Sequence, residues 1–369
     1  MSVFQKRQAF FLPDMVGGGA QRVMLNLARG IAAHGYTVDL VLAQAEGPYL
    51  TGVPESMRVV DLKASRVLSS LPALVRYLRR ERPEAMLSAM NYVNIIALWA
   101  RRLAGVPTRL VVSEHNTLSR SVQYASDQRG RLMPQLIRRF YPWADGIVAV
   151  SKGVADNLAQ VTGLSRERIQ VIYNPVVTPE LQAKAQTPLE HPWFKPGEPP
   201  VLLAVGSLTA QKDFPTLIQS FAQVRRACPI RLLILGEGED RPVLEALVSQ
   251  LGLEQDIRLP GFVENPYTYM ARAFLFVLSS RWEGLPTVLI EALFCGTPVI
   301  STDCLSGPRE ILADGQYGQL VPVGDVTALT RAIETSLEGE RPRPPRKSWH
   351  PFEMEAAVSK YINILFGSQ

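Results

Sequence analysis

The chain has 369 residues, which at about 150 residues per domain predicts two or three domains. Hydrophobic residues make up 47% and charged residues 20%, which is typical of a folded globular protein and excludes a disordered or fibrous chain. The net charge of +5 is unevenly distributed: residues 1–190 carry 23 Lys and Arg against 14 Asp and Glu, whereas residues 191–369 carry 16 against 20. We expect the basic first half to face an anionic partner, although a solvated basic surface would give the same pattern.

The three cysteines are too few and too widely spaced for a disulfide framework or a Cys-x-x-Cys metal site, which favours a reducing compartment. The apolar stretch near the N-terminus ends at Pro13 and Asp14, too early for a signal-peptide core. No apolar run reaches the roughly 18 residues of a membrane span. We expect a cytoplasmic protein, or one that binds the inner face of the cytoplasmic membrane, with no nucleic-acid partner.

Short apolar runs alternate with amphipathic segments, a pattern typical of βα units around parallel sheets. In the first half we predict a helix over 21–34, whose buried face contains Val23, Met24, Leu27, Ala28 and Ile31, and a basic amphipathic helix over 69–82. The predicted strands of this half are 8–12, 37–43, 85–89, 110–114 and 146–150.

A proline-rich stretch without periodicity, 178–200, predicts a linker or a domain-edge loop. We place the domain boundary at its start, so the predicted domains are 1–177 and 178–351, with 352–369 returning to the first as a helix that presents Ala356, Val358, Ile362 and Leu365. The predicted strands of the second half are 201–206, 231–236, 257–259, 274–279 and 298–301, and the predicted helices are 214–227, 241–251, 286–294 and 352–366. Two such α/β halves predict a ligand at the carboxyl ends of the strands, in a cleft between them.

One glycine-rich turn is a candidate phosphate site. Gly17, Gly18 and Gly19 lie between the first strand and the first helix, where the backbone can approach an anion, although a tight turn alone would use the same residues. Neither this turn nor the one at Gly236 completes a dinucleotide fingerprint, which argues against a nicotinamide-dependent dehydrogenase.

His115 follows the predicted strand 110–114, at the edge where parallel strands present ligand-binding side chains. It could donate a hydrogen bond to a sugar or phosphate oxygen, or it could be a structural histidine.

The richest motif is the segment 280–291. Pro286 opens a helix whose free N–H groups near Thr287 and Val288 form an anion site. Glu291 lies one turn further, where it could accept hydrogen bonds from ribose hydroxyls, and Glu283 precedes the helix. The alternative is two exposed glutamates at a helix terminus.

Lys212 precedes the helix predicted from Phe214 and can neutralise a diphosphate, and Asp213 is placed to cap that helix. No Asp-x-Asp pair and no cluster with metal-ligand spacing occurs in the sequence, so we expect no metal and no cofactor. The sequence also lacks a Walker phosphate loop and a Gly-x-Ser-x-Gly elbow, which argues against the usual kinases and hydrolases.

Together these motifs resemble the retaining glycosyltransferases of family 4, which have two Rossmann-like domains facing a central cleft in the GT-B arrangement. The likeness runs nearly end to end, and the Glu283 to Glu291 pair with its Gly-Leu-Pro-Thr is its most specific part. The matching segments are 17–22, 113–116, 172–175, 205–212, 236–238, 261–262, 283–291 and 307–310.

The resemblance implies roles for these residues. Lys212 would bind the diphosphate, Glu291 the ribose and Glu283 the donor sugar, and His115 and the glycines 17–19 would meet the sugar and phosphates. With His115, Glu283 and Lys212 as catalytic residues, the remaining implied donor contacts are Gly206, Ser207, Gly236, Phe262, Val263, Gly284, Leu285, Pro286, Thr287 and Val288. The family usually has Arg at the position of Ser207, so that cation would be missing or supplied by Arg281 or Arg22.

Within the family, the chain looks most like bacterial enzymes that add N-acetylhexosamines to polyprenyl-linked or surface polysaccharide precursors. This likeness implies a UDP-sugar donor, with GDP- and ADP-sugars open, and transfer with retention. We expect the basic helix 69–82 and Arg129, Arg131, Arg138 and Arg139 to bind anionic lipid or the acceptor's diphosphate. The competing interpretations are a non-hydrolysing nucleotide-sugar epimerase and a non-catalytic nucleotide-sugar-binding module.

Overall fold

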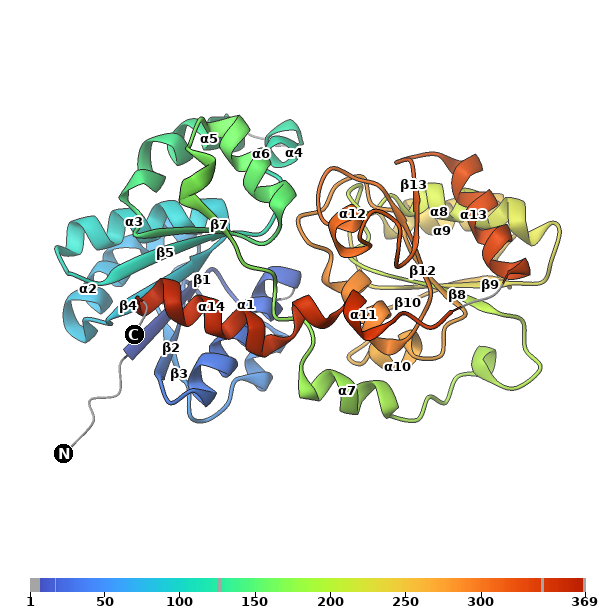
Figure 1. The fold of residues 1–369 in the computed structure, drawn as a ribbon, viewed down its shortest axis with the longest axis horizontal. Helices are drawn as coiled ribbons and strands as arrows, with labels where there is room; N and C mark the ends of the chain where they lie inside the picture. The colour runs from blue at the N-terminus through green and yellow to red at the C-terminus, as the bar shows by residue number, and fades with distance from the viewer. Residues whose placement is uncertain (1–6, 17, 125–127, 340–341, 368–369) are drawn as a thin grey trace. The chain divides into compact units, whose positions relative to one another are not determined.

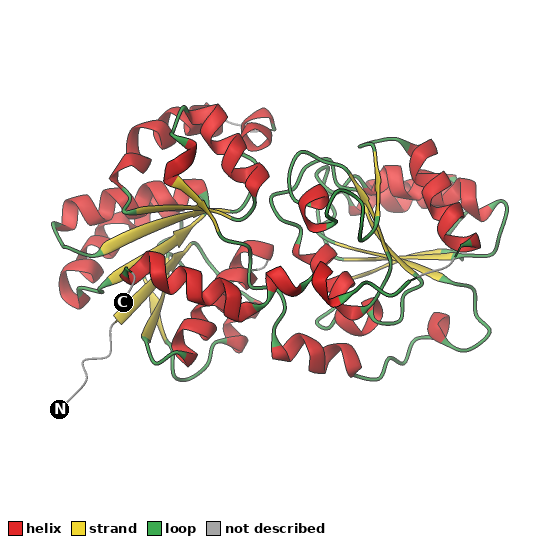
Figure 2. Ribbon diagram, in the orientation of Figure 1, coloured by secondary structure: helices red, strands yellow, loops and turns green. Residues whose placement is uncertain are grey.

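Two parallel sheets organise the chain, and each forms the centre of its own unit (Figure 1). The computed structural model describes residues 7–16, 18–124, 128–339 and 342–367. One unit comprises Met1–Val176 with Phe352–Gln369, and the other comprises Val177–Pro351. Helices cover the faces of both sheets (Figure 2), which confirms the predicted doubly wound α/β architecture.

The first unit has a seven-stranded parallel sheet in the order β3-β2-β1-β4-β5-β6-β7. Its strands are β1 (Arg7–Leu12), β2 (Thr37–Leu42), β3 (Arg58–Asp61), β4 (Ala85–Ala89), β5 (Arg109–Glu114), β6 (Gly146–Ala149) and β7 (Ile169–Val171). Its helices are α1 (Gly19–Ala33), α2 (Leu71–Glu81), α3 (Asn91–Ala104), α4 (Leu118–Gln123), α5 (Gln128–Phe140), α6 (Lys152–Thr162) and α14 (Met354–Phe366). The predicted apolar face of α1 is buried as expected.

The helix α14 belongs to the core of the first unit and packs on α1 and β5. Gly30 of α1 permits this approach, because a Cβ there would lie 2.4 Å from Val358 Cγ2. The predicted face was partly wrong: Ala356 is exposed and Ile362 is only half-buried. The helix instead buries a stripe at helical spacing, Ala357, Val358, Tyr361, Ile364 and Leu365.

The second unit has a six-stranded parallel sheet in the order β10-β9-β8-β11-β12-β13. Its strands are β8 (Val201–Val205), β9 (Arg231–Leu235), β10 (Ile257–Gly261), β11 (Leu275–Leu278), β12 (Val299–Thr302) and β13 (Gln319–Val321). Its helices are α7 (Pro179–Gln186), α8 (Phe214–Arg225), α9 (Arg241–Gln250), α10 (Tyr267–Met270), α11 (Thr287–Cys295), α12 (Pro308–Ile311) and α13 (Val326–Glu338).

The proline-rich stretch predicted as a linker or domain-edge loop contains a helix, α7, which the lack of periodicity did not predict. Pro179 occupies the first helical turn, where its missing N–H is no loss. The Thr178 side chain accepts a hydrogen bond from the Leu181 N–H at 3.2 Å and caps the helix. Proline in this stretch can therefore begin a helix as well as interrupt one.

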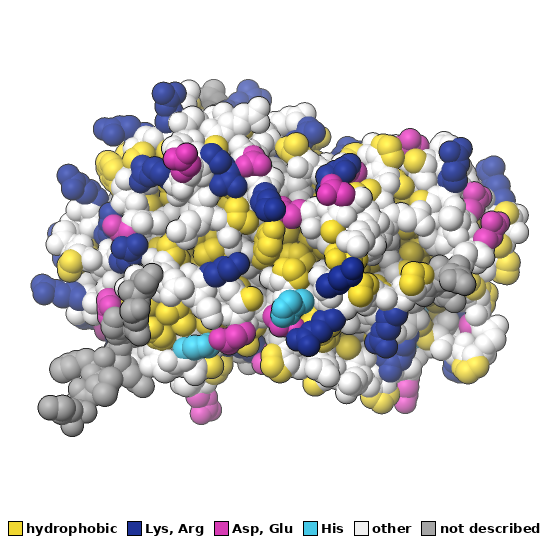
Figure 3. Space-filling view, in the orientation of Figure 1, with side chains coloured by type: hydrophobic (Ala, Val, Ile, Leu, Met, Phe, Trp, Pro, Cys, Tyr) yellow, Lys and Arg dark blue, Asp and Glu magenta, His cyan; other side chains and the backbone are white. Residues whose placement is uncertain are grey.

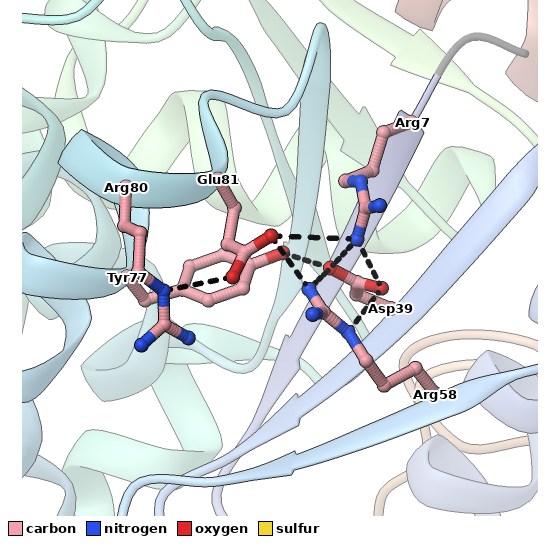
Figure 4. A network of polar contacts seen from close by, with 6 residues as sticks. All are labelled: Arg7, Asp39, Arg58, Tyr77, Arg80 and Glu81. Carbon is pink, nitrogen blue, oxygen red and sulfur yellow. Dashed lines mark hydrogen bonds and ion pairs between the residues drawn. The ribbon is translucent and has the colours of Figure 1, made fainter.

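A buried carboxylate at the amino ends of β1, β2 and β3 accounts for part of the basic excess in the first unit (Figure 4). Asp39 is fully buried and accepts hydrogen bonds from Arg7 at 3.1 Å, from Arg58 at 2.5 and 3.0 Å and from the Tyr77 hydroxyl at 2.7 Å. Glu81 of α2 lies 3.0 Å from the Arg58 guanidinium. These contacts tie α2 to three strands of the sheet.

Some of the basic side chains of α2, the predicted basic helix, therefore bind groups within the first unit. Arg80 binds Glu81 at 2.9 Å, and Arg79 donates to the carbonyl oxygens of Leu103 and Ala104 at the carboxyl end of α3, where a cation is favourable. Arg131, Arg138 and Arg139 of α5 are exposed, and the side chain of Arg129 lies outside the described residues. Figure 3 shows several Lys and Arg side chains over the helices of this unit.

Across the described ranges, no helix has both the length and the apolar character needed to cross a membrane.

Candidate active site

Two loops of the second unit are joined at the carboxyl edge of its sheet. They follow β8 and β11, neighbours at the point where the strand order reverses, which is where open α/β sheets bind ligands. The Arg281 N–H donates to the Gln211 carbonyl at 2.8 Å, and the Gln211 amide donates to the Trp282 carbonyl at 2.9 Å. The Ser279 hydroxyl adds a bond to the Lys212 carbonyl at 2.7 Å. These bonds bring together two motifs that lie about 70 residues apart in the sequence.

Lys212 and Glu283 form an ion pair between these loops. Lys212 Nζ lies 2.5 Å from Glu283 Oε1, and the Ser280 hydroxyl donates to the same oxygen at 2.7 Å. Gly206 leaves room for the lysine, because a Cβ there would lie 3.1 Å from its Cε. An ammonium has three donors, so Lys212 can hold Glu283 and still donate to a phosphate oxygen.

Asp213 does not cap α8 in the predicted way. Its backbone is left-handed with φ of 48°, which is uncommon for a residue other than glycine, and its side chain makes no capping bond to the helix backbone. The buried carboxylate accepts instead from the Arg281 guanidinium at 3.0 Å and from the Thr216 hydroxyl at 2.9 Å. Arg281 is therefore held beside the residue that follows Lys212.

Glu283 and Glu291 are both buried, with 6% and 1% of their surfaces exposed. The alternative of two exposed glutamates at a helix terminus is therefore wrong. Glu291 lies one turn after Thr287 in α11, and its charge helps burial to raise the pKa of the Cys295 thiol to about 12. A buried carboxylate near a helix N-terminus has the chemistry to accept hydrogen bonds from hydroxyl groups.

The loop 284–286 is held by the segment that follows β12. The Ser306 hydroxyl donates to the Gly284 carbonyl at 2.9 Å. Gly307 has φ of 93°, and a Cβ there would lie 2.5 Å from Pro286 Cδ. Leu285 and Thr287 are buried, Val288 is half-buried, and Ser207 on the β8 loop is exposed.

The glycines after β9 serve close backbone packing. A Cβ at Gly236 would lie 1.9 Å from the Gly206 carbonyl oxygen, so only glycine lets the β9 loop approach the β8 loop. The Gly236 N–H donates to the Gly261 carbonyl at 2.8 Å, which links this turn to the end of β10. Phe262 follows β10 with 63% of its surface exposed, and Val263 is half-buried.

In the first unit, Gly18 precedes α1 with φ of 122° and Gly19 is its first residue, and both are exposed. Gly17 lies outside the described residues. His115 follows β5, and its Nε2 lies 3.0 Å from the Ser113 hydroxyl. Burial lowers the pKa of His115 to about 4, so its imidazole is neutral at pH 7.

Sequence reasoning missed a buried polar network around Glu114. Glu114 accepts hydrogen bonds from the Tyr141 hydroxyl and from the Asn94 amide, the latter at 3.1 Å, and Asn94 in turn accepts from the Ser88 hydroxyl at 2.7 Å. Burial raises the pKa of Glu114 to about 7. The one sequence signal was a carboxylate at the end of a strand that is apolar from Leu110 to Val112.

The described parts of the chain contain no group of three or more His, Cys, Asp and Glu side chains that could hold a metal ion.

Comparisons with known proteins identify the family of the chain. Residues 17–179 match the family described as Glycosyltransferase Family 4, and residues 186–351 match Glycosyl transferases group 1. The chain is 31% identical over 355 residues, 93% of either chain, to the N-acetylgalactosamine-N,N'-diacetylbacillosaminyl-diphospho-undecaprenol 4-alpha-N-acetylgalactosaminyltransferase of Campylobacter jejuni. The chain belongs to glycosyltransferase family 4.

Further relatives and structures place this glycosyltransferase among bacterial enzymes of the GT-B fold. It is 28% identical to the lipopolysaccharide core biosynthesis glycosyltransferase LpsE of Rhizobium meliloti, over 94% of this chain and 96% of the relative. Anabaena HepE in complex with UDP and glucose has a TM-score of 0.79 at 20% identity, covering 98% of this chain and 99% of HepE. These findings confirm the predicted resemblance to bacterial polysaccharide and lipid-linked-glycan glycosyltransferases.

Proposed function

We propose that this glycosyltransferase moves an N-acetylhexosamine or hexose from a UDP-sugar to a hydroxyl group of a glycan or lipid-linked acceptor, in the assembly of a surface polysaccharide or glycoconjugate. The relative from Campylobacter jejuni is named for a transfer of this kind, and LpsE is named for lipopolysaccharide core biosynthesis. HepE, a neighbour in fold, was crystallised with UDP and with UDP-glucose.

The single observation that carries the proposal is the Lys212–Glu283 pair at the switch point of the second sheet, with buried Glu291 in the adjoining α11. The Lys212 ammonium and the N-terminus of α11 stabilise negative charge on the diphosphate without a metal ion. Glu291 accepts from the ribose hydroxyls, and Glu283 accepts from hydroxyls of the donor sugar. His115 donates a hydrogen bond to a sugar or phosphate oxygen from the first unit.

Transfer proceeds with retention in this proposal. The acceptor oxygen bonds to the anomeric carbon on the face from which the nucleotide departs, while the bond from that carbon to the phosphate oxygen breaks. The departing phosphate takes the acceptor's proton, so no separate general base is required. The protein's main contribution is then electrostatic, because the negative charge on the leaving diphosphate grows along the reaction.

A thermal-shift screen tests the donor assignment. UDP-N-acetylhexosamines and UDP-hexoses, added with EDTA, should raise the melting temperature, because a ligand that binds only the folded state stabilises it by about 2.7 kcal/mol at a hundredfold excess over Kd. GDP- and ADP-sugars at the same concentration should give smaller shifts. A shift that requires a divalent metal would contradict metal independence, and nucleotide binding with no transfer to any glycan or lipid-linked acceptor would favour a non-catalytic module.

Membrane binding is tested with the exposed arginines of α5. The triple variant Arg131→Gln, Arg138→Gln and Arg139→Gln should bind anionic vesicles on the order of a hundredfold more weakly than the unmodified protein, because each arginine near such a surface contributes about 1 kcal/mol. The measurement is co-sedimentation with phosphatidylserine vesicles over a salt series.

Three exposed cations of the second unit, Lys195, Arg226 and Arg331, provide the matched control triple to glutamine. Equal loss of binding in both triples would show a general charge effect, and no sedimentation of the unmodified protein would remove the membrane proposal.

A further inference from the structure

The helix α14 is fixed at several points, so its side chains reach β5 in a defined position. The Arg109 guanidinium donates to the Ile364 carbonyl at 2.8 Å, and Gly146 admits Ile364, since a Cβ there would lie 2.8 Å from Ile364 Cδ1. Phe366 stacks on Tyr36 with ring centroids 4.6 Å apart. Such anchoring suits a helix that must place a polar group precisely.

That polar group is the Tyr361 hydroxyl, which reaches His115 through a single side chain. It lies 3.3 Å from the Ser113 hydroxyl, and Ser113 lies 3.0 Å from His115 Nε2. Ser113 is the last but one residue of β5, and His115 is the residue that follows the strand. Tyr361 is 1% exposed and Ser113 is fully buried.

The position of each proton in the hydrogen bonds Tyr361–Ser113–His115 follows from matching every donor with an acceptor. Burial raises the pKa of the Tyr361 phenol to about 12, so it carries its proton at pH 7. When the phenol donates to Ser113, the Ser113 proton points to Nε2, and the neutral ring must carry its own proton on Nδ1. If Ser113 donated to the phenol instead, the phenolic proton would have no acceptor among the described residues, which is unfavourable for a buried donor.

We propose that Tyr361 is a positioning residue that fixes His115 as the Nδ1–H tautomer through Ser113. We call the hydrogen bonds Tyr361–Ser113–His115 the relay. Nδ1 has no protein partner within the described part of the chain, so it is the donor that His115 offers to a ligand. Its catalytic consequence rests on the proposed function, in which His115 donates a hydrogen bond to a sugar or phosphate oxygen. The relay itself exists in the ligand-free protein.

Nitrogen NMR measures the tautomer of His115 directly. The chain has four histidines, so the nitrogen spectra of protein labelled with 15N-histidine are simple, and a His115→Gln variant assigns the signal. At pH 7 the full-length protein should show His115 with its proton on Nδ1. In Tyr361→Phe, which loses only the hydroxyl, and in Ser113→Ala, the signal should move toward the tautomer mixture of a solvated imidazole. An Nε2–H tautomer in the unmodified protein, or an unchanged signal in Tyr361→Phe, would overturn the proposal.

Kinetics separate the relay from the transfer reaction. Tyr361→Phe should lower kcat with the UDP-sugar about tenfold, which is the effect of one lost hydrogen bond, with less change in KM. Combining it with Ser113→Ala should add little, because both act through one line of contacts. A tautomer shift with unchanged kcat would leave the relay standing and remove His115 from the proposed catalytic set.

Val358→Ala is the matched control on the same helix. It removes packing against Gly30, and Val358 takes no part in the hydrogen bonds of Ser113 and His115. It should lower the melting temperature and leave the His115 signal in place. A shift of that signal equal to the one in Tyr361→Phe would assign the effect to helix packing and contradict the relay.

Discussion

Lys212→Ala is expected to lower kcat/KM for the nucleotide-sugar by on the order of a hundredfold or more, as removal of a single charge-stabilising donor does in other enzymes. Its ammonium is the cation that the structure holds between the β8 and β11 loops, 2.5 Å from Glu283. Glu291→Ala should cause a loss of similar size, because Glu291 is buried and is the acceptor that we propose for the ribose hydroxyls. The measurement is transfer of labelled sugar to the acceptor under saturating and limiting donor.

Lys184→Ala, on an exposed position of α7 in the same unit, is the matched control and should be indistinguishable from the unmodified protein. Because Lys212→Ala also leaves the buried Glu283 without its cation, the double variant with Glu283→Gln is compared for melting temperature. It should recover stability without recovering transfer. Rates like those of the unmodified protein in Lys212→Ala or in Glu291→Ala would refute the site.

Asp39→Ala is expected to reduce the free energy of unfolding by about 3–5 kcal/mol, the cost of removing one partner from a buried ionic network. Arg7, Arg58 and Tyr77 would all lose the carboxylate that they share (Figure 4). Urea unfolding, analysed by linear extrapolation, measures the loss.

The same carboxylate predicts how stability depends on pH. Burial alone would raise its pKa, but the hydrogen bonds from Arg58, Tyr77 and Arg7 outweigh burial and hold the pKa of Asp39 below its ordinary value of 3.8. The stabilisation is therefore complete above that value and is lost as the pH falls through the lower pKa of the folded state. Asp39→Ala should make the unfolding free energy depend less on pH in that acidic range.

Two further variants provide comparisons for the stability loss in Asp39→Ala. Asp156→Ala breaks an exposed pair with Arg166 and should cost less than about 1 kcal/mol. Tyr77→Phe removes one hydrogen bond to Asp39 and should cost about 1 kcal/mol. A loss in Asp39→Ala no larger than in Asp156→Ala would show that the network contributes little to stability.

The long apolar strands and amphipathic helices could be predicted from the sequence because their patterns are local. The core strand β8 is a continuous apolar run, and β1 and β4 are apolar apart from Arg7, Gln8 and Ser88, as expected of strands covered on both faces. The strand β3 was missed because it is largely exposed and contains Arg58 and Asp61, and β7 and β13 were missed because each has three residues. The helix α13 was also missed.

The site could be predicted as motifs and not as contacts. The sequence predicted that Lys212, Glu283 and Glu291 bind one sugar-nucleotide donor, but the pairing of Lys212 with Glu283 depends on hydrogen bonds between two loops. The left-handed backbone of Asp213 has no sequence signal of the kind that glycine gives. Tyr361 and Ser113 are 248 residues apart, so no local pattern could join them.

The return of α14 to the first unit also constrains how the chain folds during synthesis. The core around β1, β4 and β5 includes Val358, Tyr361 and Leu365, which leave the ribosome after all of Val177–Pro351. Domains generally fold as units while the chain emerges from its N-terminus. Here the later unit has its complete sequence first, and the earlier unit must wait with an uncovered apolar face for its last helix.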